Sequence, residues 1–191
     1  MDIQNKNRKL LKKNYVYDET MEHDACGVGL VASTEGLKSR KVVEYGIEAL
    51  KAVWHRGAID ADGKTGDGAG IHIEIPNDFF AEKIEITGHK HDNSDLCVGM
   101  IFLPRNDFGG QEQCRSIVES ELTKKNFNIY GWRQVPVDPS VLGEKAEQTR
   151  PEITQVLFTH NDKSIHGKDL ERALYETRRK IEKEALKNQL N

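Results

Sequence analysis

Short apolar runs of strand length alternate along this chain with segments whose apolar residues have helical spacing. The runs that we expect to form strands are residues 27–33, 71–75, 96–103, 127–137 and 153–158. The segments with apolar residues three or four positions apart are 38–54, 77–84, 110–125 and 167–187. Strands with amphipathic helices between them predict sheets covered by helices. Pro136 favours an edge position or a strand end for the fourth run.

Two of the helical segments differ in what their faces predict. The segment 38–54 has a broad apolar face, so it must pack on something. The segment 167–187 carries one narrow apolar stripe, formed by Leu170, Leu174, Ile181 and Ala185. Its other residues are mostly charged, and we expect that face to be solvated. Between the first helix and the second strand, residues 55–70 hold five glycines and three aspartates, which predicts a loop.

Composition excludes several classes of protein. The chain has 191 residues, of which 37% are hydrophobic and 31% charged, and its net charge is −3. That charge gives no general attraction to nucleic acid or to a membrane surface. No apolar run approaches the roughly 20 residues that a membrane helix needs. The three cysteines fit neither a disulfide framework nor a zinc pattern, which suggests a reducing compartment and a cytoplasmic location.

The first fifteen residues form a distinct basic segment. They carry Lys6, Arg8, Lys9, Lys12 and Lys13 against a single acidic residue, Asp2. The apolar region of a secretory signal is absent, and the lack of serine argues against a transit peptide. A disordered or removable leader is therefore the simpler interpretation.

Cys26 follows a small residue, Ala25, and opens the first apolar run. A cysteine in this context could become the N-terminal residue of a mature enzyme. It would then carry both a thiol nucleophile and an α-amino group that accepts the thiol proton, so no separate base would be needed. Cys97 and Cys114 lack this context, and we expect both to be small buried hydrophobes.

Arg56 lies just beyond the first helical segment, in the sequence His55-Arg56-Gly57-Ala58. A guanidinium in such a loop can grip a carboxylate with two parallel hydrogen bonds, which lysine cannot do. The position is equally typical of an arginine that complements a helix end or lies on the surface. Spacing alone leaves these alternatives open.

Three nucleotide or metal motifs are matched only weakly. Residues 27–32 fit the dinucleotide pattern G-x-G-x-x-A, but the glycines lie inside an apolar strand rather than at a strand–helix turn. Residues 58–65 approach the phosphate loop, with alanine in place of its first glycine and a helix in place of the preceding strand. Asp60 and Asp62 begin something like a calcium loop, but Lys64 occupies a ligand position. These matches leave one alternative function open, a nucleotide-binding protein that uses Gly63-Lys64-Thr65.

Several segments together resemble the N-terminal part of the glutamate synthase large chain, a class II (N-terminal nucleophile) glutamine amidotransferase domain. The resemblance is carried by residues 22–29, 55–58, 61–62, 65–71, 142–143, 150–156 and 174–179. It extends from about Tyr17 to near the end of the chain, and its two clustered motifs, around Cys26 and around Arg56, are specific in combination.

The resemblance implies an α+β fold, an Ntn-hydrolase-like four-layer α-β-β-α sandwich that is incomplete because the chain is truncated. It implies that residues 1–25 are a propeptide and that residues 26–191 are the N-terminal part of the amidotransferase domain. Cys26 would be the catalytic nucleophile that attacks the side-chain amide of glutamine. Arg56 would hold the α-carboxylate of glutamine, with Gly57 and Ala58 shaping the same pocket.

The resemblance also implies what is missing. The family's Asn-Gly stretch, which forms the oxyanion hole, has no counterpart in this chain. No cofactor is expected in this segment, while FMN and an iron–sulfur cluster are implied for the full-length enzyme. The implied partners are the rest of the synthase chain and a small NAD(P)H-oxidising subunit, with NADPH, NADH and ferredoxin left open as electron donors. The alternative is a non-catalytic truncated remnant, or a partner domain, of the same fold.

Overall fold

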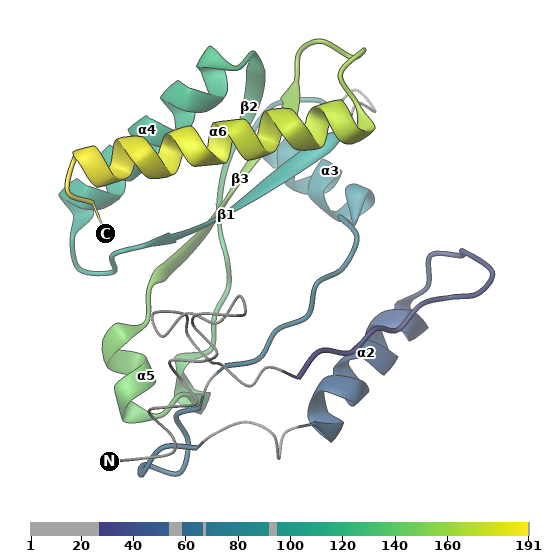
Figure 1. The fold of residues 1–191 in the computed structure, drawn as a ribbon, viewed down its shortest axis with the longest axis vertical. Coiled ribbons are helices and arrows are strands. Elements are labelled where there is room, and N and C mark those ends of the chain that lie inside the picture. Colours follow the sequence, from purple (N-terminus) through teal and green to yellow (C-terminus); the bar gives the residue numbers. More distant parts are fainter. Residues whose placement is uncertain (1–26, 54–58, 67, 92–94, 191) are drawn as a thin grey trace, which may run out of the picture. The chain divides into compact units, whose positions relative to one another are not determined.

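The computed structural model describes residues 27–53, 59–66, 68–91 and 95–190. The chain divides into two compact units. One comprises residues 1–58 and 68–71, and the other comprises residues 59–67 and 72–191. Figure 1 shows the helices and strands of both.

The second unit is built on a three-stranded antiparallel sheet. Its strands are β1 (Leu96–Leu103), β2 (Phe127–Gln134) and β3 (Glu152–His160), in the order β1-β3-β2. The central strand β3 is the most deeply buried, because helices cover parts of both its faces and a strand flanks each edge. As expected, the strand that precedes Pro136 lies at an edge of the sheet, and it ends two residues before that proline.

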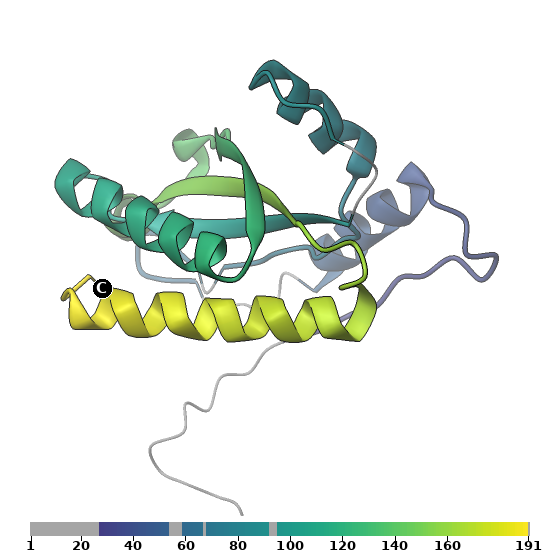
Figure 2. The ribbon, with the colours of Figure 1, turned by 90° about the horizontal axis from the view of Figure 1, so that it is seen from above.

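Two helices cover one face of this sheet, α4 (Phe108–Lys124) and α6 (Gly167–Lys187). Figure 2 shows them side by side along that face. Val118 and Leu122 of α4 and Leu170 of α6 pack there against buried residues of all three strands, which are Cys97, Phe127, Val156 and Phe158. The predicted stripe of α6 is confirmed at Leu174 and Ile181, which pack against the same cluster. We call residues 96–187, which include the sheet, α4 and α6, the sheet body.

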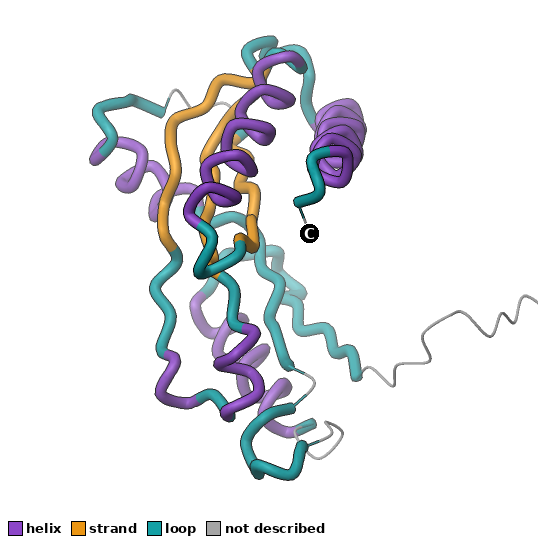
Figure 3. Tube along the Cα trace, turned by 90° about the vertical axis from the view of Figure 1, so that its left-hand side faces the viewer, coloured by secondary structure: helices purple, strands orange, loops and turns teal. Residues whose placement is uncertain are grey.

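The opposite face of the sheet carries a smaller cluster beneath α3 (Asn77–Ile86). Phe80 and Ile84 of that helix pack against Leu96, Tyr130 and Leu157. Figure 3 shows the strands with α3 on one side and with α4 and α6 on the other. The helix ends at Ile86, two residues beyond the predicted end at residue 84.

A β-bulge in β2 allows this strand to contribute side chains to both apolar clusters. The register with β3 shifts between Ile129 and Gly131, which adds one residue to β2 and reverses the alternation of its side chains. Trp132 therefore packs on the same face as Ile129, while Tyr130 packs on the α3 face. Gly131 has φ of +145°, a conformation that favours glycine. The Thr87 hydroxyl, at the end of α3, donates to the Tyr130 carbonyl at 3.2 Å.

Between β2 and β3 the chain forms two short helical elements that the sequence analysis did not predict. They are η2 (Pro139–Val141) and α5 (Glu144–Thr149). The Asp138 side chain accepts from the backbone N–H of Ser140 and so caps η2. Neither element has a buried residue, so neither shows the apolar periodicity by which a helix is recognised.

The first unit contains α2 (Arg40–Ala52), capped by the Ser39 side chain. The Ile71 side chain reaches Gly46 of this helix, where a β-carbon would lie 3.3 Å from Ile71 Cδ1. The expected packing of a broad apolar face is not seen, since no residue of α2 is buried within the described part of the chain.

Two predicted strands are wrong. Residues 27–33 and 71–75 form no ladder in the described part of the chain. A strand needs a neighbour to accept its backbone hydrogen bonds, and neither segment has one among these residues. Apolar alternation therefore identified segments that can be buried, without identifying a pairing partner.

Candidate functional site

The residues that the sequence analysis assigned to catalysis and substrate binding lie outside the described residues. These are Cys26 and the loop residues Arg56, Gly57 and Ala58. The described segments nearest to them in sequence are residues 27–29, which follow Cys26, and residues 59–66, which follow Ala58. Their roles therefore stay predictions, and the geometry concerns the segments that adjoin them.

The two described thiols are poor candidates for a nucleophile. Cys97 is buried in the core beneath α4 and α6, where burial raises the pKa of its thiol from 9.0 to about 12, with Asp95 and Glu171 adding to the effect. Burial also raises the pKa of the half-buried Cys114 thiol, with a contribution from Asp107. Because the thiolate is the reactive form, a raised pKa makes both groups less reactive near neutral pH than an ordinary exposed thiol. This confirms the prediction of burial for Cys97.

Residues 59–66 form a small hairpin, which we call the 59–66 hairpin. Ile59 and Gly66 face each other in an antiparallel bridge. Inside it, the Asp60 N–H donates to the Thr65 carbonyl at 2.7 Å. The Asp62 carboxylate accepts from the Thr65 N–H at 2.7 Å and from the Thr65 hydroxyl at 2.5 Å. These bonds, led by the Thr65 hydroxyl, hold the pKa of the Asp62 carboxyl far below its usual value.

The hairpin packs on the chain at the start of α5. Gly143, which precedes α5, is buried against it, so that a β-carbon on Gly143 would lie 2.2 Å from Thr65 Oγ1 and 2.3 Å from Asp62 Oδ2. A backbone hydrogen bond from Glu144 also contributes to lowering the pKa of Asp62. Beside it, Lys145 Nζ lies 2.5 Å from Asp60 Oδ2. The hairpin is thus fixed to a segment about 80 residues away in the sequence.

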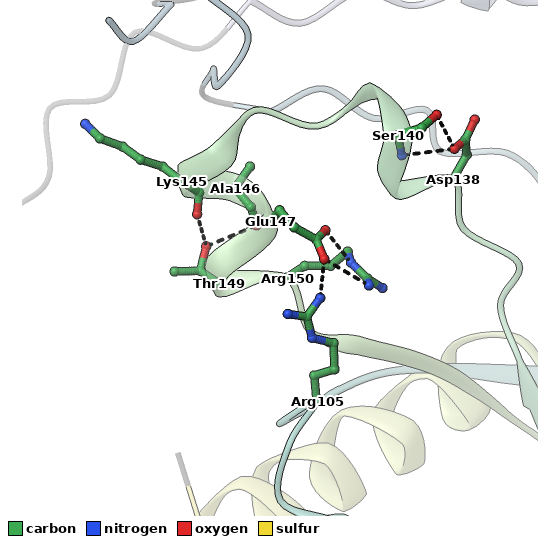
Figure 4. A network of polar contacts seen from close by, with 8 residues as sticks. All are labelled: Arg105, Asp138, Ser140, Lys145, Ala146, Glu147, Thr149 and Arg150. Atoms are coloured by element: carbon green, nitrogen blue, oxygen red, sulfur yellow. Dashed lines mark hydrogen bonds and ion pairs between the residues drawn. The ribbon is translucent and has the colours of Figure 1, made fainter. Parts of the chain in front are cut away.

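A second polar cluster lies on the other side of α5. Figure 4 shows Arg105 and Arg150 converging on the carboxylate of Glu147. Arg150 Nε donates to Glu147 Oε2 at 2.8 Å, and Arg105 donates to Oε1. The two guanidinium groups lower the pKa of Glu147, Arg150 more than Arg105. Both arginines line an open pocket of about 630 Å³ between the end of β1 and the start of β3.

The side chains that line this pocket do not form a recognisable catalytic site. Its arginines already share one carboxylate, and Asp107 adds a second negative charge to its lining. No cysteine, serine or histidine side chain lines it. Across the described residues, no three histidine, cysteine or acidic side chains come close enough to hold a metal ion. None of the helices in this part of the chain is long and apolar enough to cross a membrane.

Sequence reasoning missed Gly143 and its neighbours as part of the site's surroundings. Leu142 and Gly143 contributed to the family resemblance, but a glycine between two polar segments is not by itself evidence of a close contact. Its φ of −75° is open to any residue. The reason for glycine lies in the hairpin that packs on it, and no local pattern contains that information.

Comparison with known proteins gives one family and a consistent set of relatives. Residues 26–191 match the glutamine amidotransferases of class II. The glutamate synthase [NADPH] large chain of Azospirillum brasilense is 52% identical over 175 residues, which is 92% of this chain and 12% of the relative. The chloroplastic ferredoxin-dependent glutamate synthase 2 of Arabidopsis thaliana is 38% identical over 88% of this chain and 10% of its own length. The ferredoxin-dependent glutamate synthase of Pyropia yezoensis is 39% identical over 85% and 10%. The chain thus spans about a tenth of the relatives that it matches.

Proposed function

Because this chain belongs to the class-II glutamine amidotransferases, we propose that it supplies the glutamine-hydrolysing part of a glutamate synthase. The observation that carries this proposal is the 52% identity to a glutamate synthase large chain across 92% of the chain. The reaction would release glutamate and ammonia from glutamine, and the full enzyme would use the ammonia to aminate 2-oxoglutarate.

Cys26 is the proposed nucleophile. The family match begins at this residue, in agreement with a mature chain whose first residue is Cys26 and a leader of residues 1–25. The burial and raised pKa of Cys97, and the raised pKa of Cys114, support the choice because both make the other two thiols weaker nucleophiles.

The reactants would be the thiol and α-amino group of Cys26, glutamine and water. The α-amino group of Cys26 takes the thiol proton, and the sulfur bonds to the side-chain amide carbon of glutamine. The C–N bond breaks as the amide nitrogen takes that proton, and ammonia leaves. Water then adds to the thioester carbon and the C–S bond breaks, which releases glutamate and restores the thiol.

Arg56 is the proposed substrate clamp. Its guanidinium would hold the α-carboxylate of glutamine with two parallel hydrogen bonds, and the small residues Gly57 and Ala58 would shape the same pocket. The adjoining 59–66 hairpin is held by the bonds of Asp62 and by the bridge of Ile59 to Gly66.

The fold that we propose for residues 26–191 is part of the four-layer α-β-β-α sandwich. The sheet with α4 and α6 on one face supplies two layers of it. On the other face, beyond α3, Met100 and Phe102 of β1 are 49% and 64% exposed. They continue the alternation of Leu96 and Val98, so they lie on the α3 face. An apolar sheet face of this kind is suited to a second sheet, which further parts of a longer protein would supply.

The redox chemistry of a glutamate synthase would belong to other parts of the protein. FMN and an iron–sulfur cluster would supply electron transfer there. The relatives are named for NADPH and for ferredoxin, so the electron donor is not decided by the resemblance. The remainder of the synthase chain is the proposed partner, with a small NAD(P)H-oxidising subunit as a further one.

The test is glutamine hydrolysis in the full-length protein that carries this sequence. Cys26→Ser should reduce the rate by roughly a thousandfold or more, whereas Cys114→Ser should leave it unchanged. N-terminal sequencing should find Cys26 as the first residue. Undiminished hydrolysis in the Cys26→Ser protein would refute the assignment, as would a mature N-terminus elsewhere.

The alternative, a non-catalytic remnant or partner domain of the same fold, predicts a different result in the same experiment. Such a protein would not hydrolyse glutamine, and its Cys26 thiol would react with a glutamine analogue no faster than with a simple alkylating reagent. Selective labelling of Cys26 by the analogue would exclude it.

A further inference from the structure

Strand β1 lies at an edge of the sheet, because β3 pairs with it on one side only. Among the described residues, no other segment forms a ladder with β1. In an antiparallel ladder, alternate residues of a strand direct their N–H and C=O groups toward the partner, and the residues between them direct these groups away from it. Every second residue of β1 therefore presents a backbone donor and a backbone acceptor along its outer side.

The sequence of β1 lacks the features that keep an edge strand unpaired. Natural edge strands are protected by charged side chains, by proline or by a bulge. Residues 96–103 contain no charged residue and no proline, and their register with β3 is continuous. The other edge strand, β2, carries Arg133 and the bulge at Gly131, and the Thr87 hydroxyl donates to its Tyr130 carbonyl. The regular, apolar edge of β1 is therefore the one suited to pair with a further strand.

The chain makes one complete crossover on this sheet. Because β1 and β2 are both antiparallel to β3, they run parallel to each other, with β3 between them. The helix α4 connects them across the face that it shares with α6. Crossovers of this kind are right-handed in about 98% of cases. On this face, a strand that points in the direction of β1 is thus followed by a parallel strand on the β2 side.

Strand β3 and helix α6 form the first two elements of a second crossover on the same face. Because β3 runs opposite to β1, a crossover of the same hand moves in the opposite direction across the sheet, away from β2 and past β1. The strand that completes it would be parallel to β3 and antiparallel to β1, and it would lie directly on the open edge of β1. Two interlocked crossovers of this kind form the βαββαβ arrangement, a recurring motif.

Helix α6 ends where such a strand would have to begin. Leu170, in its first turn, belongs to the same buried cluster as Cys97, the second residue of β1. Near its other end, Asn188 Oδ1 accepts from the Gln113 amide of α4 at 3.2 Å, and residues 104–107 connect the end of β1 to the start of α4. Figures 1 and 2 show α6 ending at that end of the sheet. A chain that continues from there can run back along β1 without a long connection.

We propose that the open edge of β1 pairs, antiparallel, with a strand formed by the polypeptide that follows this sequence in a full-length protein. This chain corresponds to 12% of the length of the Azospirillum brasilense large chain, so a protein of that length has polypeptide to supply the strand. Connections from a helix to a strand are usually two to six residues long, so the strand should begin within roughly ten residues of Lys187.

The chemistry of the occupant follows from the two faces of β1. On the α3 face, the added strand would place side chains beside Met100 and Phe102, which are 49% and 64% exposed. On the other face, its side chains would lie beside Ile101 and Leu103, on the side that α4 and α6 cover. Apolar cross-strand pairs are favourable at both kinds of position. The occupant is thus an uncharged, mainly apolar strand. The inference goes beyond the proposed function, because it concerns how this unit joins the rest of the polypeptide.

Amide hydrogen exchange in the full-length protein, resolved to single residues by fragmentation in a mass spectrometer, tests the pairing. The amides of β1 that bond to β3 are the internal reference. If a strand pairs with the open edge, the amides between them should be protected as well, with exchange slowed by at least about a hundredfold relative to an unstructured chain. Protection that alternates along residues 97–103 would mean that the edge is open and that the inference is wrong.

A short photoreactive side chain identifies the occupant. A diazirine amino acid in place of Phe102 should cross-link to polypeptide within about twenty residues of Lys187, because neighbouring strands lie about 4.8 Å apart. In place of Met100, it should reach residues about two positions later, because the added strand runs opposite to β1. The matched control replaces Tyr175, which is 59% exposed on α6, and should give no cross-link to that segment.

Mixing isotopically light and heavy copies of the protein separates the possible sources of the strand. Cross-links within one molecule, in the expected order, support the inference. Cross-links between a light and a heavy copy overturn it, because a second molecule would then occupy the edge. Cross-links to a distant part of the same chain, or in the reverse order, overturn it as well. None of these results depends on glutamine hydrolysis, so the proposed function is tested separately.

Discussion

The strands and helices of the sheet body bury many apolar side chains, whereas none of the residues from 27 to 53 is buried in the described part of the chain. Val156 and Leu157 in β3 are 1% and 2% exposed. In contrast, Val28 and Leu30 are 94% and 92% exposed, and α2 has no buried residue. The two regions have comparable apolar patterns in the sequence, so the difference lies in what packs against them.

The contrast indicates that the sheet body provides most of the folding stability, whereas the proposed catalytic residues adjoin segments that contribute little to it. Apolar burial is the main driving force for folding, so we expect the sheet body to unfold as one cooperative unit. The segments that adjoin Cys26 and Arg56 contribute little to that unit and are expected to open at lower free energy. The 59–66 hairpin is the exception among the segments before residue 76, because it is bonded within itself and to α5.

The largest difference in stability between the two regions is expected when one leucine in each is replaced by alanine. Leu157→Ala should lower the free energy of unfolding by roughly 2–5 kcal/mol, since it leaves a cavity in a closed core. Leu30→Ala should change it by less than about 0.5 kcal/mol, as for an exposed side chain. Urea denaturation followed by tryptophan fluorescence measures both. Equal losses for the two variants would show that residues 27–53 are packed as tightly as the sheet body.

Replacing one glycine in each region by alanine should give the next largest difference in the free energy of unfolding. A β-carbon on Gly99 of β1 would lie 2.7 Å from Val156 Cγ1, and Val156 has no room to yield. We expect Gly99→Ala to lower the free energy of unfolding by roughly 1–3 kcal/mol, as for other overpacked cores. Gly29 has no atom within 4 Å of its β-carbon position, so Gly29→Ala serves as the matched control and should leave stability unchanged. A neutral Gly99→Ala would mean that the sheet can open locally.

The third difference concerns pH. Burial raises the pKa of the Cys97 thiol from 9.0 to about 12, so the folded protein keeps this proton when the unfolded chain has lost it. The contribution to stability is complete below pH 9 and is lost as the pH rises toward 12. At pH 10 the loss should be about 1 kcal/mol.

The difference between the unsubstituted protein and Cys97→Ala isolates this contribution from lysine and tyrosine titration. The free-energy gap between the two proteins should narrow between pH 8 and pH 10 in urea denaturation. A constant gap would mean that the Cys97 thiol is accessible to water and that the core beneath α4 and α6 is not closed.

The smallest effect is expected on the solvated face of α6. Glu182 pairs with Arg178 at 3.3 Å and also with Arg179, and all three side chains are well exposed. Glu182→Gln should lower the free energy of unfolding by less than about 0.5 kcal/mol, with no effect at high salt. Leu170→Ala on the same helix should cost roughly 2–5 kcal/mol. Similar losses would mean that burial of Leu170 contributes no more to stability than an exposed ion pair within α6.

The elements predicted from local periodicity are the strands β1, β2 and β3 and the helices α2, α3, α4 and α6. The bounds of α6 agree with the prediction at both ends, because its narrow apolar stripe between charged residues occurs only in an amphipathic helix. The strands β1 and β3 were recognised from continuous apolar runs. The predictions that failed, residues 27–33 and 71–75, have equally good apolar patterns but no pairing partner in the described residues.

Two features of the candidate site's surroundings could not be predicted. The turn of the 59–66 hairpin contains Asp62 and Lys64, which resembled an imperfect calcium or phosphate loop, whereas the Asp62 carboxylate instead bonds to Thr65 and Lys64 of its own turn. The need for glycine at position 143 arises from Thr65, 78 residues earlier in the chain. Local patterns contain no information about contacts at that separation.

The amino-acid sequence by itself determined the family, through short motifs around Cys26 and Arg56. It also determined the approximate positions of β1, β2, β3, α4 and α6, because propensity and periodicity act over a few neighbouring residues. The tertiary structure decided the strand order β1-β3-β2, the bulge at Gly131 that turns Trp132 into the core, and the close packing of Gly143 against the 59–66 hairpin. Each of these depends on which distant residues meet, and that is settled by the burial of apolar surface and the pairing of backbone groups over the whole chain.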